Sequence, residues 1–133
     1  ADMTRTVAVG EISSELRQIY DIVYEAQEFA RRRIIPGMTG QDADSLARDI
    51  IESKGYGDRF GHGLGHGVGL LVHEEPRLGL KSDVVLKSGM IVTVEPGIYL
   101  PDAGGVRIED LSFIKEDGLE ILSTSPRELI VIE

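Results

Sequence analysis

Hydrophobic positions spaced three and four residues apart predict two helices in the first half of the chain. Ser13 is placed to cap the first helix, and Pro36 and Gly37 end it. Thr39 is the expected N-cap of the second helix, and Gly55 is the glycine expected just after its C-terminus. The apolar stripe of the first comprises Leu16, Ile19, Tyr20, Val23, Ala26 and Ala30. That of the second comprises Ala43, Leu46, Ala47, Ile50 and Ile51.

Short runs of β-branched and apolar residues predict strands on either side of these helices. The first run covers residues 3–9. The later runs cover residues 90–94, 106–108, 111–114, 119–122 and 129–132. Turn sequences rich in Gly and Asp separate several of them. Two helices followed by sequential strands predict an α+β fold, in which the helices pack on a mainly antiparallel sheet, rather than a βαβ repeat.

Composition narrows the class of protein. The 133 residues suit a single domain, and a formal charge of −9 argues against a nucleic-acid partner. The absence of Cys excludes disulfides, thiolate zinc sites and a Cys nucleophile. Since no apolar run reaches 18 residues and no basic-then-apolar leader is present, we expect a soluble, cytoplasmic domain without a membrane partner.

The three His residues of the chain, His62, His66 and His73, lie within twelve positions of one another. Five of the nine residues in 61–69 are Gly, which lets side chains converge and a ligand approach. A phosphate-binding loop is the alternative use of such a segment, but the spacing of neither common glycine motif is present. The residues after His73 also do not complete the H-E-x-x-H zinc pattern.

Acidic residues interrupt or end apolar strands at two places. Glu95 follows the run 90–94, and Glu109 follows Val106–Arg107–Ile108 on the same face as Arg107. Asp2 lies at the start of the first strand. These acids lie on an exposed sheet face or bind a metal. One His with several carboxylates suits Mn²⁺, Co²⁺, Fe²⁺ or Zn²⁺.

Five motifs in order resemble those of the pita-bread metallopeptidases, a family that includes methionine aminopeptidase, aminopeptidase P and prolidase. They are DMTRT at 2–6, GHGLGHGVG at 61–69, HEEP at 73–76, VEPGIY at 94–99 and GVRIED at 105–110. The resemblance implies the α+β pita-bread fold with a curved sheet. It also implies that residues 1–133 form a single domain, the C-terminal part of a catalytic domain. The upstream half and a separate N-terminal domain would then lie outside this chain.

The resemblance implies a site with two divalent ions, Mn²⁺ or Co²⁺ ahead of Zn²⁺ or Fe²⁺. Asp2 and Glu109 resemble the bridging carboxylates, and His66 resembles the single His ligand. Glu95 resembles the ligand that also serves as general base toward water. A fifth ligand of the family, an aspartate upstream of Asp2, is absent from this sequence. We therefore expect this chain to hold at most one ion weakly and to be inactive alone.

The outer histidines His62 and His73 resemble residues that orient substrate and stabilise the tetrahedral intermediate, and Arg107 resembles an arginine that pairs with the metal-binding acids. The presence of His62 favours a prolidase or aminopeptidase P, which cleave Xaa-Pro bonds in proline-containing peptides, over methionine aminopeptidase. Leu71 replaces an Asp found in many relatives. A non-catalytic binding or scaffold module on the same fold is the remaining alternative. Exposed sheet edges predict a homo-oligomer.

Overall fold

The computed structural model describes all 133 residues and confirms the α+β class. Its two long helices are α1 (Ser14–Arg33) and α2 (Gly40–Ser53), followed by a short 3₁₀ helix, η1 (Gly57–Arg59). The strands are β1 (Ala8–Val9), β2 (Gly65–Gly67), β3 (Glu74–Leu78), β4 (Ile91–Val94), β5 (Gly97–Leu100), β6 (Gly104–Arg107), β7 (Asp110–Lys115), β8 (Gly118–Ile121) and β9 (Val131–Ile132). None of the helices combines the length and apolar character needed to cross a membrane.

Both predicted helices form with their predicted caps. The Ser13 side chain accepts a hydrogen bond from the backbone of Leu16, and Thr39 forms a reciprocal capping box with Asp42. Gly55 follows the C-cap of α2 with a φ of 85°, a conformation that glycine adopts without strain. Local sequence therefore determines where the helices begin and where α2 ends.

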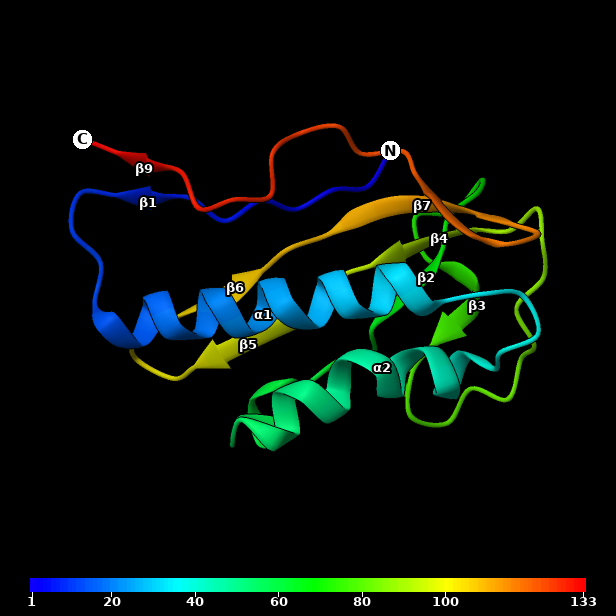
Figure 1. Cartoon of the computed structure of the whole chain (residues 1–133), viewed down its shortest axis with the longest axis horizontal. Coiled ribbons are helices and arrows are strands. Elements are labelled where there is room, and N and C mark those ends of the chain that lie inside the picture. The colour runs from blue at the N-terminus through cyan, green and yellow to red at the C-terminus, as the bar shows by residue number, and fades with distance from the viewer.

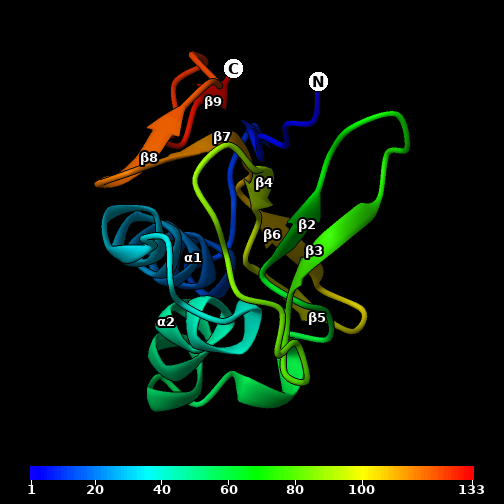
Figure 2. The ribbon, with the colours of Figure 1, turned by 90° about the vertical axis from the view of Figure 1, so that its right-hand side faces the viewer.

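The strands form three groups. A five-stranded antiparallel sheet has the order β3-β2-β4-β7-β8, and β5 and β6 form a separate antiparallel hairpin. β1 and β9 form a parallel pair, whereas all the other strand pairs are antiparallel. The sheets are therefore mainly antiparallel, as expected. α1 runs along the strands with α2 below it (Figure 1), and the loop that joins β2 and β3 projects away from the helices (Figure 2). One continuous apolar core joins the helices to the sheet.

The prediction of a strand over residues 3–9 was wrong for most of its length. Only Ala8–Val9 form a strand, and Thr4 pairs with Glu109 at a single bridge. Side-chain hydrogen bonds replace the backbone hydrogen bonds that a longer strand would form here. The Thr6 hydroxyl donates to the carbonyl of Arg107 and accepts from its N–H. The expected strand at 129–132 likewise shortens to Val131–Ile132.

Three strands were not predicted, namely β2, β3 and β5. β2 lies in the glycine-rich segment, where Gly65 packs so closely on β4 that a Cβ atom there would lie 2.0 Å from the carbonyl oxygen of Thr93. Glycine is present in this strand because two backbones approach closely. That requirement comes from the tertiary structure and leaves no period-two pattern in the sequence.

Candidate metal centre

Strand pairing brings four segments that are distant in sequence to one place. β2, which carries His66, pairs with β4 at Gly67 and Val92. β4 pairs with β7 up to Val94 and Asp110, so Glu95 and Glu109 lie just beyond the paired ends of these neighbouring strands. The bridge between Thr4 and Glu109 adds the N-terminal segment with Asp2. The four metal-ligand candidates are therefore assembled by backbone register.

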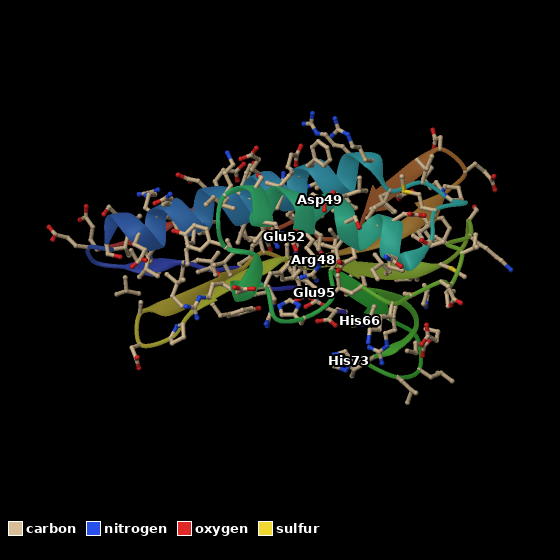
Figure 3. All side chains as sticks on the ribbon, turned by 90° about the horizontal axis from the view of Figure 1, so that it is seen from below. Arg48, Asp49, Glu52, His66, His73 and Glu95 are labelled. Carbon is tan, nitrogen blue, oxygen red and sulfur yellow. The ribbon has the colours of Figure 1, made fainter.

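The side chains converge as the proposed ligand set requires. One ligand atom each of Asp2, His66 and Glu109 lies within 4.8 Å of the others. The Nε2 atom of His66 is 3.6 Å from Oδ2 of Asp2 and 3.1 Å from Oε1 of Glu95. His66 and Glu109 are buried, and Asp2 and Glu95 are largely covered. Figure 3 shows His66, His73 and Glu95 in the same region of the molecule.

Hydrogen bonds fix the orientation of His66. Its Nδ1 lies 3.0 Å from the carbonyl oxygen of Gly67. Since a carbonyl can only accept, Nδ1 donates to it, and Nε2 is the ring atom on the side of the carboxylates. The buried Thr93 hydroxyl accepts from the backbone N–H of His66 at 3.0 Å and donates to Oε1 of Glu95 at 3.0 Å. Thr93 thus orients two ligand candidates at once.

The electrostatics of the site favour a cation. Burial, reinforced by the negative charges of Glu95 and Asp2, raises the pKa of Glu109 from its ordinary value of 4.5 to about 7, against an opposing hydrogen bond from Thr4. Three carboxylates and one imidazole are a hard-to-borderline donor set that fits Mn²⁺, Co²⁺, Fe²⁺ or Zn²⁺. A divalent ion would offset the burial and the repulsion that raise the pKa of Glu109.

Arg107 lies beside the carboxylate of Glu95. Its Nε is 3.9 Å from Oε2 of Glu95 and donates to the Thr4 hydroxyl at 3.1 Å. Its Nη1 donates to the Tyr99 hydroxyl at 3.3 Å. The sequence predicts that Arg107 pairs with the metal-binding acids; the structure places it near Glu95, and it reaches Glu109 only through Thr4.

The outer histidines border a cavity of about 390 Å³ whose lining includes His62, His66, His73, Glu95 and Arg107. The His73 ring lies 4.3 Å from that of His66, centroid to centroid. His62 Nδ1 is 2.8 Å from the Gly63 carbonyl, so its Nε2 accepts from the Tyr99 hydroxyl at 2.7 Å. A peptide in this cavity would meet both His62 and His73.

A buried ion pair on α2 supports the loop that carries His62. Arg48 donates to both carboxylate oxygens of Asp44, at 2.6 and 3.0 Å, and to the carbonyls of Phe60 and His62, at 3.0 and 2.8 Å. Asp44 also accepts from the backbone N–H of Leu64 at 2.8 Å. Figure 3 labels Arg48 in the same view as His66 and Glu95. The helix thereby fixes the backbone around the candidate histidines.

Sequence reasoning missed four residues at this site: Thr4, Thr93, Tyr99 and Arg77. Arg77 lines the same cavity, and its guanidinium makes no ion pair or hydrogen bond. Alternation within a strand could have placed Thr93 on the face of Glu95, and Thr4 on that of Asp2. For Arg77 and Tyr99 the sequence carries no comparable signal, because β3 and β5 were not predicted.

Comparison with known proteins identifies relatives for nearly the whole chain. The family model described as metallopeptidase family M24 matches residues 1–116. A Xaa-Pro dipeptidase of Pyrococcus furiosus is 52% identical over 130 residues, which cover 98% of this chain and 37% of the relative. The solved structure of a Xaa-Pro dipeptidase from Bacillus anthracis is 55% identical with a TM-score of 0.98, over 99% of this chain and 37% of that one.

A second solved structure, an X-Pro aminopeptidase from Thermotoga maritima, is 49% identical with a TM-score of 0.95, over 99% of this chain and 38% of that one. These neighbours confirm the pita-bread fold expected from the motifs. The chain spans about 37% of the length of the curated relatives it matches. Its expected place as the C-terminal part of a catalytic domain stays a prediction.

Proposed function

Since the chain belongs to metallopeptidase family M24, we propose that it supplies the metal-binding centre of an exopeptidase that hydrolyses Xaa-Pro bonds. The observation that carries this proposal is the convergence of Asp2, His66 and Glu109 within 4.8 Å, with Glu95 beside His66. The relatives named Xaa-Pro dipeptidase support the bond specificity. The activity would belong to the longer protein of which such a chain is about 37%.

Asp2, His66, Glu95 and Glu109 would hold the metal, and Mn²⁺ or Co²⁺ is our first expectation. Divalent ions at such a site activate water and polarise the scissile carbonyl. We propose two ions for the longer protein and a single, weakly held ion for this chain. The reason is that a centre with two ions shares its carboxylates between them, and this chain offers only three carboxylates and one imidazole at the site.

Glu95 is placed to act as general base. Its carboxylate is largely covered, faces the cavity and is held by the Thr93 hydroxyl, so it can accept a proton from water without losing its orientation. As water adds to the carbonyl carbon, the proton passes by way of Glu95 to the proline nitrogen, and the carbon–nitrogen bond breaks. His73 would donate a hydrogen bond to the developing oxyanion. His62, whose ring nitrogens bond the Gly63 carbonyl and the Tyr99 hydroxyl, would orient the substrate.

Arg77 supports dipeptides as substrates. Its exposed guanidinium lines the cavity and makes no ion pair in the structure. It can therefore bind the terminal carboxylate of a dipeptide through two parallel hydrogen bonds, as a bidentate pair. A specific observation also favours longer peptides. A second cavity of about 720 Å³ adjoins the first at His62 and Arg77 and would accommodate residues beyond the proline. An Xaa-Pro aminopeptidase is therefore the second candidate.

We further propose that the chain self-associates. Apolar side chains are exposed along β1 and β9, including Val9 at 75%, and both strands have an unpaired edge. Light scattering on the purified chain tests this proposal, and a strictly monomeric chain at micromolar concentration would contradict it.

The decisive experiment replaces the matching segment of the Pyrococcus furiosus Xaa-Pro dipeptidase with this chain. With Mn²⁺ or Co²⁺, the chimaera should hydrolyse Ala-Pro but not Ala-Ala, and Glu95→Gln should lower kcat by about 10²- to 10⁴-fold. Comparing Ala-Pro with Ala-Pro-Ala separates the two candidates, since a dipeptidase cleaves only the first. The 133-residue chain alone should show no turnover. A folded, metal-loaded chimaera that cleaves neither peptide would refute the proposal.

A further inference from the structure

The Thr4 hydroxyl lies between two charged groups of the candidate centre. It donates a hydrogen bond to Oε2 of Glu109 and accepts one from Nε of Arg107 at 3.1 Å. The direction is fixed by chemistry, because a guanidinium only donates and a hydroxyl has a single proton to give. Arg107 and Glu109 form no direct ion pair, so the Thr4 hydroxyl is what links the Arg107 guanidinium to the Glu109 carboxylate.

The backbone holds Thr4 in place independently of its hydroxyl. Thr4 and Glu109 form an antiparallel bridge, in which the N–H of Glu109 donates to the Thr4 carbonyl at 3.0 Å. The guanidinium of Arg5 donates to the carbonyls of both residues, at 2.9 Å for Thr4 and 2.6 Å for Glu109. Removing the hydroxyl should therefore change the side-chain contacts while leaving the two segments paired.

Thr4 also determines what remains free on Glu109. The hydroxyl binds Oε2, and no protein group donates a hydrogen bond to Oε1. Asp2, two residues earlier in the extended segment, lies on the same face as Thr4, so both side chains point toward Glu109. The arrangement fixes the carboxylate with one oxygen open on the side where Asp2 and His66 converge.

We infer that Thr4 is a positioning residue for metal binding: its hydroxyl orients the Glu109 carboxylate and spaces Arg107 from it. This inference rests on the proposed function, because it concerns the same metal centre. Hydroxyls and carboxylates that hold metal ligands in place change metal affinity by about 10- to 100-fold when they are removed. An effect of that size is expected for Thr4.

The test compares three variants of the 133-residue chain. Thr4→Val keeps the shape of the side chain and removes the hydroxyl, and Thr4→Ser keeps the hydroxyl. Thr6→Val is the matched control, because Thr6 lies on the same face of the same segment but bonds only the backbone of Arg107. Mn²⁺ binding is measured by electron paramagnetic resonance at fixed pH, and folding is verified by circular dichroism.

Thr4→Val should weaken Mn²⁺ binding about 10- to 100-fold, while Thr4→Ser and Thr6→Val stay within about threefold of the original chain. If Thr6→Val weakens Mn²⁺ binding as much as Thr4→Val, the effect comes from disturbing the N-terminal segment in general and not from the Thr4 hydroxyl. The inference then fails. It also fails if Thr4→Val binds as tightly as the original chain.

A second readout needs no metal. In a crystal structure of the metal-free Thr4→Val chain, the Glu109 carboxylate or the Arg107 guanidinium should leave its position, and in Thr4→Ser both should keep it. Unchanged positions in Thr4→Val would overturn the inference. If the original chain binds no Mn²⁺, the metal-centre proposal fails by itself, and the crystal structures still decide the role of Thr4.

Discussion

Replacing Arg48 with Met removes the cation from the buried ion pair that supports the His62 loop. Arg48 is 6% exposed and Asp44 is fully buried, so the carboxylate would keep only the N–H of Leu64 as a partner. The carbonyls of Phe60 and His62 would also lose their donor. Removing one partner of a buried ion pair lowers the free energy of unfolding by about 3–5 kcal/mol. That is a large part of the total free energy of unfolding expected for a chain of this length, roughly 7–20 kcal/mol.

Urea unfolding followed by far-ultraviolet circular dichroism measures this loss. With a slope of about 2 kcal/mol per molar urea, the midpoint of Arg48→Met should fall by roughly 1.5–2.5 M. Lys54→Met is the matched control, because Lys54 and Glu25 form an exposed ion pair at 3.7 Å. Lys54→Met should lower the free energy of unfolding by less than about 1 kcal/mol.

A double variant tests the cause. Adding Asp44→Asn to Arg48→Met removes the stranded charge, so the double variant should be more stable than Arg48→Met alone. If Arg48→Met costs no more than Lys54→Met, the ion pair does not support the loop. If the double variant is less stable than the single one, the stranded carboxylate is not the source of the loss.

Three further predictions concern stability. Without metal, the raised pKa of Glu109 means that the folded state holds a proton the unfolded state releases, so the free energy of unfolding should fall as pH rises from about 4.5 to about 7, by at most ~1.4 kcal/mol per pH unit. Glu109→Gln should flatten this part of the pH profile in chelator-treated samples; equal slopes would refute the assignment. Thr39→Ala breaks the capping box with Asp42 and should lower the free energy of unfolding by about 1 kcal/mol in urea titrations, and no change would contradict the cap. Gly65→Ala forces a Cβ against the Thr93 carbonyl and should cost about 1–3 kcal/mol in the same assay, whereas a neutral effect would show that β2 and β4 can separate at no cost.

Elements defined by local sequence were predictable from it. The helices follow from apolar spacing and from caps such as Ser13 and Thr39. β2 was missed because its glycines reflect the close approach of β4 rather than a strand pattern. The burial of Gln27, which donates to Asp110, was missed for a related reason: its polar position on α1 is satisfied by a partner 83 residues away.

The candidate site divides in the same way. Asp2, His66, Glu95 and Glu109 could be named from motifs, and the structure brings all four together. The groups that hold them, such as Thr4, are ordinary residues whose role depends on strand register. Register is set by long-range pairing, so these contacts become visible only in the folded chain.

The most direct test of the metal centre is a Mn²⁺ titration of the purified chain at pH 7.5 by isothermal calorimetry. We predict one weakly bound ion per chain, with affinity reduced at least tenfold by either His66→Ala or Glu109→Ala and unchanged by the control Lys54→Met. Absence of Mn²⁺ binding by the folded chain, or binding that survives both alanine variants unchanged, would contradict the assignment of these residues as metal ligands.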